Sequence, residues 1–233
     1  MMKKYENKYF SILGDSISTL AGYSQPKEAA YYDGDTRLFS RVRTSMDTWW
    51  GQVIDALGGK LLVNNSWSGS LVCKHSLCEI PSYGCSDERT SALDKDGISP
   101  DVILVYMGTN DWGHGVRVLQ EGTEVAEPCS IFSAAYTTML KKLQRNYPDA
   151  EIWCFTMPIT RCSAKENFTF PYYFGGRHIE EYCKAITACA QALGCRVVDL
   201  YNRPDFPDTM EGFHPTASGM KTIADAVLAL INE

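Results

Sequence analysis

Short apolar runs that end at glycine or at a polar turn recur along the chain and predict the strands of a buried sheet. The run Asp101–Met107 is the most strand-like, because it is rich in β-branched residues and lies between Pro100 and Gly108. Continuous apolar runs are typical of parallel strands that are covered on both faces. The five predicted strands cover residues 9–13, 60–64, 101–107, 151–156 and 196–200.

Apolar residues spaced three and four positions apart predict helices between these strands. The expected helices cover residues 48–57, 129–146, 178–193 and 217–231. Ser130 is the expected N-cap of the second helix, and Gly194 is the expected stop of the third. Residues 21–47 lack clear periodicity and are expected to form a long surface connection over one rim of the sheet.

Alternating strands and helices predict right-handed crossovers and a parallel sheet with helices on both faces. The expected fold is therefore α/β, a flavodoxin-like three-layer α/β/α sandwich with a five-stranded parallel sheet. Because no repeat or linker divides the chain, residues 1–233 are expected to form a single domain. In such sheets, sites form outside the carboxyl ends of the strands.

Candidate catalytic residues follow the predicted strands. Ser16 comes directly after the first strand, where a short turn can hold a nucleophile clear of the sheet. A serine needs a base to remove its proton and donors for the oxyanion that forms. Asn110, after the third strand, and His214, before the last helix, supply residue types suited to these tasks.

Four short blocks resemble, in order, the conserved blocks of the GDSL esterase/lipase family, also called SGNH hydrolases: Gly14-Asp15-Ser16, Gly69, Gly108-Thr-Asn110-Asp111 and His214-Pro215. The resemblance extends over roughly residues 9–231 and implies a carboxylic ester hydrolase with the SGNH fold. It also implies that Ser16 is the nucleophile and His214 the base. The implied oxyanion hole consists of the N–H groups of Ser16 and Gly69 and the side-chain amide of Asn110.

The chain departs from the family pattern at the triad acid. The family usually has aspartate three residues before the histidine, whereas this chain has Glu211. A glutamate can orient an imidazole, but its extra methylene displaces the carboxylate by about one C–C bond. Either the loop compensates for this displacement, or Asp208 serves as the acid.

Substrate contacts are predicted from aromatic and polar residues near these blocks. Residues 161–177 form an insertion rich in aromatic side chains, which is either a pocket wall or a loop packed on its own rings. Aromatic rings beside polar groups suit a short acyl chain or a sugar ring. The candidate pocket residues are Asp15, Trp67, Trp112, His114, Tyr172 and Tyr173.

Composition indicates a small molecule as the partner, and the family resemblance implies that this molecule is an ester. A net charge of -6 without a dense Lys/Arg patch argues against nucleic acid or an anionic membrane surface as the partner. No apolar segment is long enough to span a bilayer, and the N-terminus lacks the apolar region of a secretory signal. Cys154, Cys183, Cys189 and Cys195 fall in strand or helix patterns and are expected to be reduced core residues, so the expected location is cytoplasmic.

No cofactor or metal is expected. Cys73, His75, Cys78 and Cys85 are potential zinc ligands, but their spacing matches no recurrent zinc motif. Two other functions remain alternatives to a short-chain esterase. One is a lysophospholipase or lipase-type acylhydrolase, and the other is a non-catalytic flavodoxin-like binding protein, which intact Ser16, Asn110 and His214 argue against.

Overall fold

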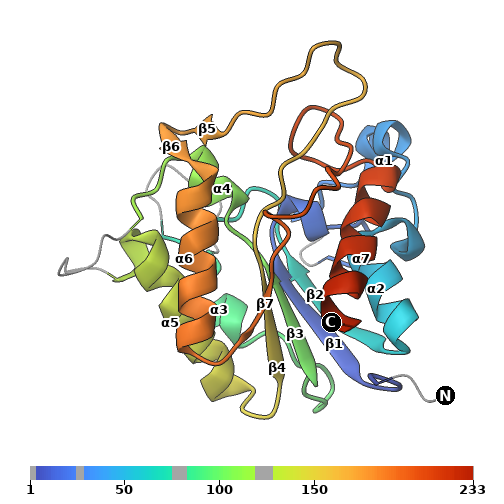
Figure 1. The fold of residues 1–233 in the computed structure, drawn as a ribbon. Helices are drawn as coiled ribbons and strands as arrows, with labels where there is room; N and C mark the ends of the chain where they lie inside the picture. Colours follow the sequence, from blue (N-terminus) through green and yellow to red (C-terminus); the bar gives the residue numbers. More distant parts are fainter. Residues whose placement is uncertain (1–3, 25–28, 75–82, 119–127, 233) are drawn as a thin grey trace.

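Five parallel strands form the central sheet of the computed structural model, which describes residues 4–24, 29–74, 83–118 and 128–232 (Figure 1). The strands lie in the order β2-β1-β3-β4-β7. Their bounds are β1 Tyr9–Gly14, β2 Lys60–Ser66, β3 Val102–Tyr106, β4 Glu151–Phe155 and β7 Arg196–Val198. The expected α/β sandwich with a five-stranded parallel sheet is confirmed.

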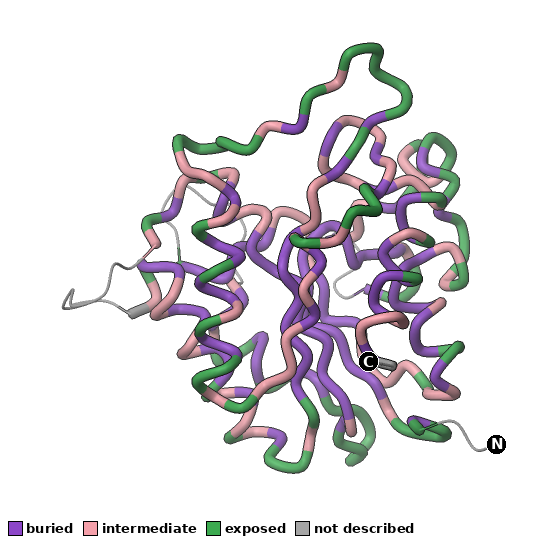
Figure 2. The backbone as a smooth tube through the Cα atoms, viewed as in Figure 1, coloured by how far each residue is buried: buried purple, intermediate pink, exposed green. Residues whose placement is uncertain are grey.

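Alternating side chains of these strands face two separate layers of helices. Phe10 and Ile12 pack in the apolar cluster beneath α2 (Trp49–Leu57) and α7 (Ala217–Asn232). Leu13, on the opposite face, packs in the cluster beneath α5 (Phe132–Asn146) and α6 (Ile179–Ala192). Burial on both faces explains why the strands have continuous apolar sequences (Figure 2).

The predicted boundary of the second long helix is wrong. Residues 128–130 form a separate 3-10 turn, and α5 begins at Phe132 with Ile131 as its N-cap, so Ser130 does not cap it. Ile131 is buried in an extended conformation, and the N–H of Phe132 donates to Arg117 O at 3.0 Å. A hydrogen bond from another part of the chain thus satisfies the N–H of Phe132 at the start of the helix, where the sequence analysis expected capping by the Ser130 side chain.

The described residues of the connection 21–47, namely 21–24 and 29–47, contain more secondary structure than their sequence predicts. This connection contains α1 (Gly34–Ser40) and a 3-10 turn at residues 45–47. Asp33 and Thr36 form a capping box at the N-terminus of α1. Only Ser40 of this helix is buried. The helix therefore lacks the apolar stripe by which periodicity is recognised.

Shorter elements complete the edge of the sheet at the carboxyl ends of the strands. These are a 3-10 turn at residues 16–18, α4 (Thr109–Gly113) and a hairpin of β5 (Tyr173–Phe174) and β6 (Arg177–His178). The short helix α3 (Asp87–Thr90) instead packs beside the end of α5, where the Asn146 side-chain amide donates to Thr90 O at 2.9 Å. Within the described residues, no helix is both long and apolar enough to cross a membrane.

Phe155 tests the packing on the α2/α7 face. Its side chain is fully buried, with ring centroids 5.0 Å from Trp49 and 5.6 Å from Tyr106. Phe155→Ala should lower the free energy of unfolding by about 3–5 kcal/mol, because the cavity it leaves cannot fully collapse. The control Phe39→Ala removes a ring that is 78% exposed and should change it by less than about 0.5 kcal/mol. Urea-induced unfolding measures both, and equal effects would contradict this account of the core.

Candidate active site

Ser16 begins the turn that follows β1. Asp15, extended at the N-cap, accepts a hydrogen bond from the Ile17 N–H at 3.0 Å and closes the turn. Gly14 is required here, since a Cβ at this position would lie 2.6 Å from Ser66 Oγ and 2.8 Å from Ser18 Cβ. The strand end and its turn thereby direct Ser16 toward the carboxyl edge of the sheet.

His214 reaches Ser16 from a tight loop ahead of α7. The loop closes through a bridge between Thr209 and Pro215 and through the Met210 N–H, which donates to His214 O at 2.9 Å. At the tip of this loop Gly212 has a φ of 124°, a backbone angle that residues with a side chain rarely adopt. In this loop His214 Nε2 lies 2.9 Å from Ser16 Oγ.

Glu211 lies on the other side of the imidazole. Its Oε1 is 2.5 Å from His214 Nδ1 and also accepts the His214 backbone N–H at 2.9 Å. Burial raises the pKa of Glu211, but hydrogen bonds and the charge of His214 outweigh it, so this pKa lies below its ordinary value. The tight loop compensates for the extra methylene of glutamate, because it brings the carboxylate within hydrogen-bond distance of both the backbone N–H and Nδ1 of His214.

Asp208, the alternative acid, is engaged elsewhere. Its Oδ1 accepts the Ser163 N–H at 2.8 Å, and its Oδ2 accepts the Thr216 hydroxyl at 3.2 Å. Burial raises the pKa of Asp208, but these hydrogen bonds and the charge of Arg161 bring it below its ordinary value. Asp208 therefore fastens the ends of the loop, whereas Glu211 contacts the imidazole.

Gly69 lies on the loop that follows β2, and Asn110 lies in α4, which follows β3. Gly69 has a φ of 73° in a turn closed by the Ser70 N–H, which donates to Trp67 O at 3.1 Å. The Asn110 side-chain amide donates to Ser70 O at 3.0 Å, which joins the loop after β2 to α4. Asn110 lines the same cleft as Ser16 and His214.

A buried arginine that the sequence analysis missed braces the loop after β2. Arg89 is 1% exposed and donates to Gly14 O at 2.9 Å, to Asn65 O at 2.8 Å and to Ser70 Oγ at 2.7 Å. Burial lowers the pKa of Arg89 to about 9, although the charges of Asp15 and Glu88 oppose this shift. Its surroundings in the sequence are polar and charged, so no pattern there indicates burial.

Asp111 performs a similar task between β3 and the second block. Its carboxylate is fully buried and accepts the N–H groups of Val72 at 2.8 Å and Cys73 at 3.0 Å. Burial raises the pKa of Asp111 to about 7, although these N–H groups favour the charged form. The sequence block contained Asp111 but gave it no role.

Tyr31, which the sequence analysis also missed, covers His214. Its ring is stacked on the His214 imidazole, with centroids 3.6 Å apart and planes 10° from parallel. The Tyr31 N–H donates to Thr19 Oγ1 at 2.9 Å, and the neighbouring Tyr32 hydroxyl donates to Pro215 O at 2.8 Å. Burial, and next the charge of Glu211, raises the pKa of the Tyr31 phenol to about 12, so this ring is neutral at physiological pH.

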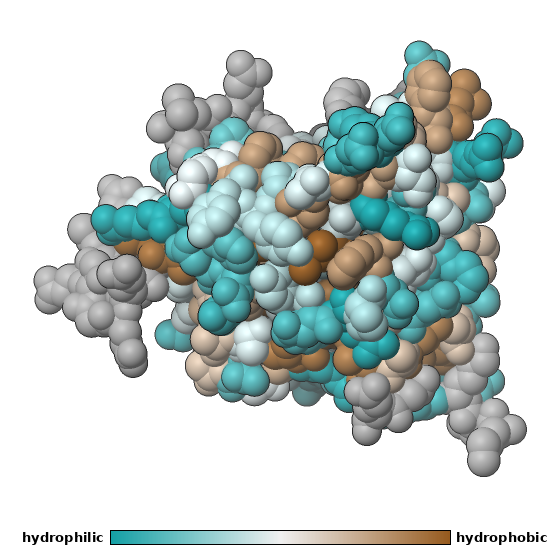
Figure 3. All heavy atoms as spheres, turned by 45° about the horizontal axis from the view of Figure 1, so that its top comes forward, coloured by the Kyte–Doolittle hydropathy of each residue, from teal (hydrophilic) through white to brown (hydrophobic). Residues whose placement is uncertain are grey.

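Ser16, Asn110 and His214 line a cleft of about 340 Å³. On the part of this face that Figure 3 shows, hydrophobic residues form small patches among hydrophilic ones. His114, a predicted pocket residue, lines the cleft, and Phe174 and Phe213 supply aromatic walls that the sequence analysis did not select. The residues that line the cleft are Ser16, Ile17, Thr109, Asn110, Gly113, His114, Phe174, Phe213 and His214.

The other predicted pocket residues do not line this cleft. Asp15 is fully buried under the turn, where burial raises its pKa to about 6. Trp67 packs against the Arg89 guanidinium, and Trp112 is buried with its indole N–H bound to Arg177 O at 2.9 Å. These three side chains are directed into the protein because each faces a partner there.

Tyr172, just before the hairpin, and Tyr173, in β5, are 40% and 70% exposed and pack against His178 rather than into the cleft. In the two-stranded β5/β6 hairpin, it is Phe174 that turns toward α4. Successive residues of a strand point to opposite faces, so Tyr173 and Phe174 cannot both face the cleft. The sequence alone does not show which of the two does.

Two of the four potential zinc ligands lie in the part of the chain that the structure describes. Cys73 and Cys85 are buried, and both are free thiols, whereas His75 and Cys78 lie outside the described residues. Among the described residues, no three side chains of the metal-binding types cluster.

Known proteins resemble this chain in sequence and in structure. A protein from Bacteroides uniformis that is assigned as a GDSL-like lipase is 28% identical, with a TM-score of 0.72 over 97% of this chain and 96% of that one. A second, from Bacteroides ovatus, is 24% identical, with a TM-score of 0.73 over 97% and 99%. A family two carbohydrate esterase from Clostridium thermocellum, in complex with cellohexaose, has a TM-score of 0.58 at 19% identity, over 98% of this chain and 65% of that one.

A comparison with curated proteins gives no match. The model of the GDSL-like Lipase/Acylhydrolase family matches residues 8–167, which include the first three sequence blocks. The matched region covers more than half of the chain. The fold of this chain also agrees with that of the Bacteroides uniformis protein over nearly its whole length. This chain therefore belongs to the GDSL-like lipase/acylhydrolase family.

Proposed function

We propose that this protein is a serine esterase that cleaves short-chain acyl esters, with acetylated carbohydrates as candidate substrates. The observation that carries the proposal is the hydrogen-bonded series from Ser16 Oγ to His214 Nε2 at 2.9 Å and from His214 Nδ1 to Glu211 Oε1 at 2.5 Å. This is the geometry by which an acid and an imidazole activate a serine hydroxyl.

In the proposed reaction, Ser16 Oγ attacks the ester carbonyl while His214 Nε2 takes its proton. The N–H groups of Ser16 and Gly69 and the amide of Asn110 stabilise the oxyanion, and one such donor is worth about 3 kcal/mol of barrier. Collapse of the intermediate expels the alcohol, which receives the proton from His214. Water activated by His214 then attacks the acyl-enzyme and releases the acid and Ser16.

Glu211 is the proposed orienting acid. Its hydrogen bond to Nδ1 fixes the tautomer in which Nε2 faces Ser16, and its negative charge stabilises the imidazolium formed during attack. The lowered pKa of Glu211 keeps this carboxylate charged at neutral pH.

A carbohydrate substrate is supported by the fold shared with the Clostridium thermocellum carbohydrate esterase and by the open cleft with Phe174, Phe213 and His114 in its wall. One observation favours the lipase alternative, because Leu38, Phe39 and Met46 expose apolar side chains on and after α1. Rates with long-chain esters below and above their aggregation point distinguish the two, since a lipase gains activity at the interface.

Ser16→Ala and His214→Ala should each abolish most hydrolysis of a chromogenic acetate ester and leave the unfolding transition in place. Members of one catalytic unit fail together, so the double variant should be no slower than either single variant. Initial rates measured on the three proteins test this. A double variant that loses a further large factor would indicate that the two residues act in separate processes.

Glu211→Gln should lower kcat by several orders of magnitude, because the amide cannot stabilise the imidazolium and permits the wrong tautomer. Asp208→Asn is the matched control, since it alters a carboxylate on the same loop that does not contact His214. It should retain most activity. Normal rates in Glu211→Gln together with a collapse in Asp208→Asn would reverse the assignment.

Tyr31→Leu should reduce kcat by about tenfold with little change in KM, because the imidazole loses the flat neutral surface that holds its plane. Tyr31→Phe keeps the ring and should retain most activity, which separates stacking from any role of the phenol group. Steady-state kinetics of both variants decides this. If Tyr31→Phe is as slow as Tyr31→Leu, the hydroxyl and not the ring matters.

A further inference from the structure

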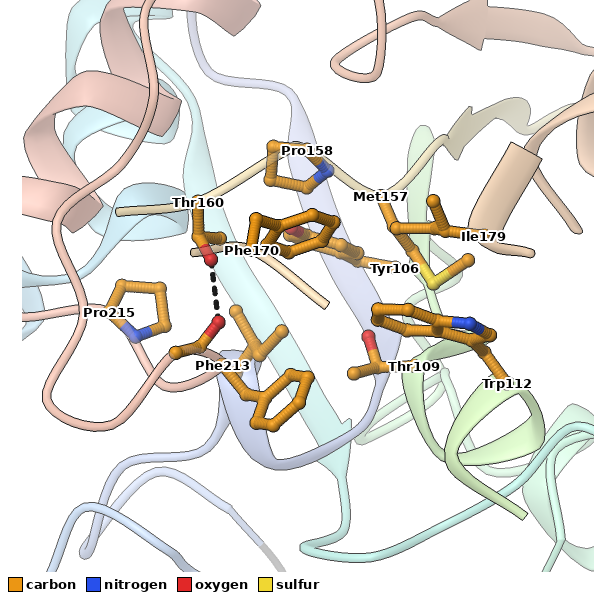
Figure 4. A pocket seen from close by; sticks show the side chains of 12 residues that line it. Tyr106, Thr109, Trp112, Met157, Pro158, Thr160, Phe170, Ile179, Phe213 and Pro215 are labelled. Carbon is orange, nitrogen blue, oxygen red and sulfur yellow. Dashed lines mark hydrogen bonds between the residues drawn. The ribbon is translucent and has the colours of Figure 1, made fainter. Parts of the chain in front are cut away.

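A small apolar cavity adjoins the cleft, on the side of the sheet edge where β3 and β4 end (Figure 4). Its walls include Trp112, Met157, Phe170 and Ile179, and none of these side chains carries a charge. Its volume is about 20 Å³. Roughly 10–15 Å³ is enough for one water-sized group, so the cavity has room for a methyl group and little more.

The cavity and the cleft share three residues, Ile17, Thr109 and Phe213. Two of these are the chain neighbours of the proposed nucleophile and base, because Ile17 follows Ser16 and Phe213 precedes His214. The cavity is therefore next to the place where an acyl group bound to Ser16 would begin.

The walls of the cavity are firmly held. Phe170 is 8% exposed and packs against Trp112 and Tyr172, with ring centroids at 5.8 Å and 5.2 Å. Ile179 is 1% exposed at the start of α6, and its N–H donates to Tyr172 O at 2.9 Å. Closely packed walls do not readily expand, so a longer chain would have to displace well-ordered side chains.

We propose that this cavity receives the methyl group of an acetyl ester and thereby makes the enzyme a deacetylase that rejects longer acyl groups. The inference rests on the proposed esterase function and adds to it the acyl group and the residues that set its length. The cavity makes no bond itself. It positions the acetyl carbon skeleton while the alcohol part of the substrate lies in the wider cleft.

The test compares kcat/KM for 4-nitrophenyl acetate, butyrate and hexanoate. The wild-type protein should prefer acetate to butyrate by at least about tenfold, since one or two methylene groups in a tight pocket are worth that much discrimination. Phe170→Ala and Ile179→Ala enlarge the cavity from different elements, and each should lower the acetate-to-butyrate ratio by about tenfold through faster butyrate turnover.

Phe174→Ala is the matched control, because Phe174 lines the cleft but not the cavity. The acetate-to-butyrate ratio of kcat/KM for this variant should equal that of the wild-type protein. An unchanged ratio in both cavity variants, or the same change in Phe174→Ala, would overturn the inference and place the acyl group in the open cleft. If Phe170→Ala fails to fold, Ile179→Ala decides. A wild-type protein that hydrolyses none of the esters would instead refute the proposed function, whereas hydrolysis without chain-length preference would refute the cavity alone.

Discussion

The 2.9 Å contact between Ser16 Oγ and His214 Nε2 joins two residues that are 198 positions apart, and much of the sheet edge is arranged to keep it. Ser16 lies in the turn after the first strand, and His214 lies in the loop before the last helix. A contact of this length tolerates little displacement, because a shift of even one ångström breaks the hydrogen bond. The contact therefore depends on the packing of the sheet that carries the turn after β1 and of α7, which follows the His214 loop.

Buried polar groups, rather than apolar packing alone, hold this edge together. Arg89 binds the ends of β1 and β2, and Asp111 binds the loop after β2 to α4. Burial of these charges is costly, as the lowered pKa of Arg89 and the raised pKa of Asp111 indicate. The cost is offset by several directed hydrogen bonds to backbone atoms, which fix loop positions that apolar contacts would leave free.

Residues 29–32 link the remaining parts of the site. Ala29 O accepts the Ser68 N–H at 2.8 Å, Tyr31 is stacked on His214, and Tyr32 binds Pro215 O. One short stretch thus contacts both the second block and the loop of the histidine. The insertion at residues 161–177 acts on the opposite side, where Phe170 closes the small cavity and Phe174 lines the cleft. Segments outside the four sequence blocks therefore surround the candidate site.

The sequence by itself determined the sheet, the four long helices and the identity of Ser16, His214 and Glu211 as neighbours of strand ends and of the last helix. These follow from periodicity and from short-range blocks, which the chain expresses locally. Only the tertiary structure decided that Glu211 rather than Asp208 contacts His214, because that choice depends on how the loop closes. It also decided the roles of Arg89 and Tyr31 and the choice of Phe174 over Tyr172 and Tyr173. Their partners lie far away in the chain or depend on hairpin register, and no local pattern encodes such contacts.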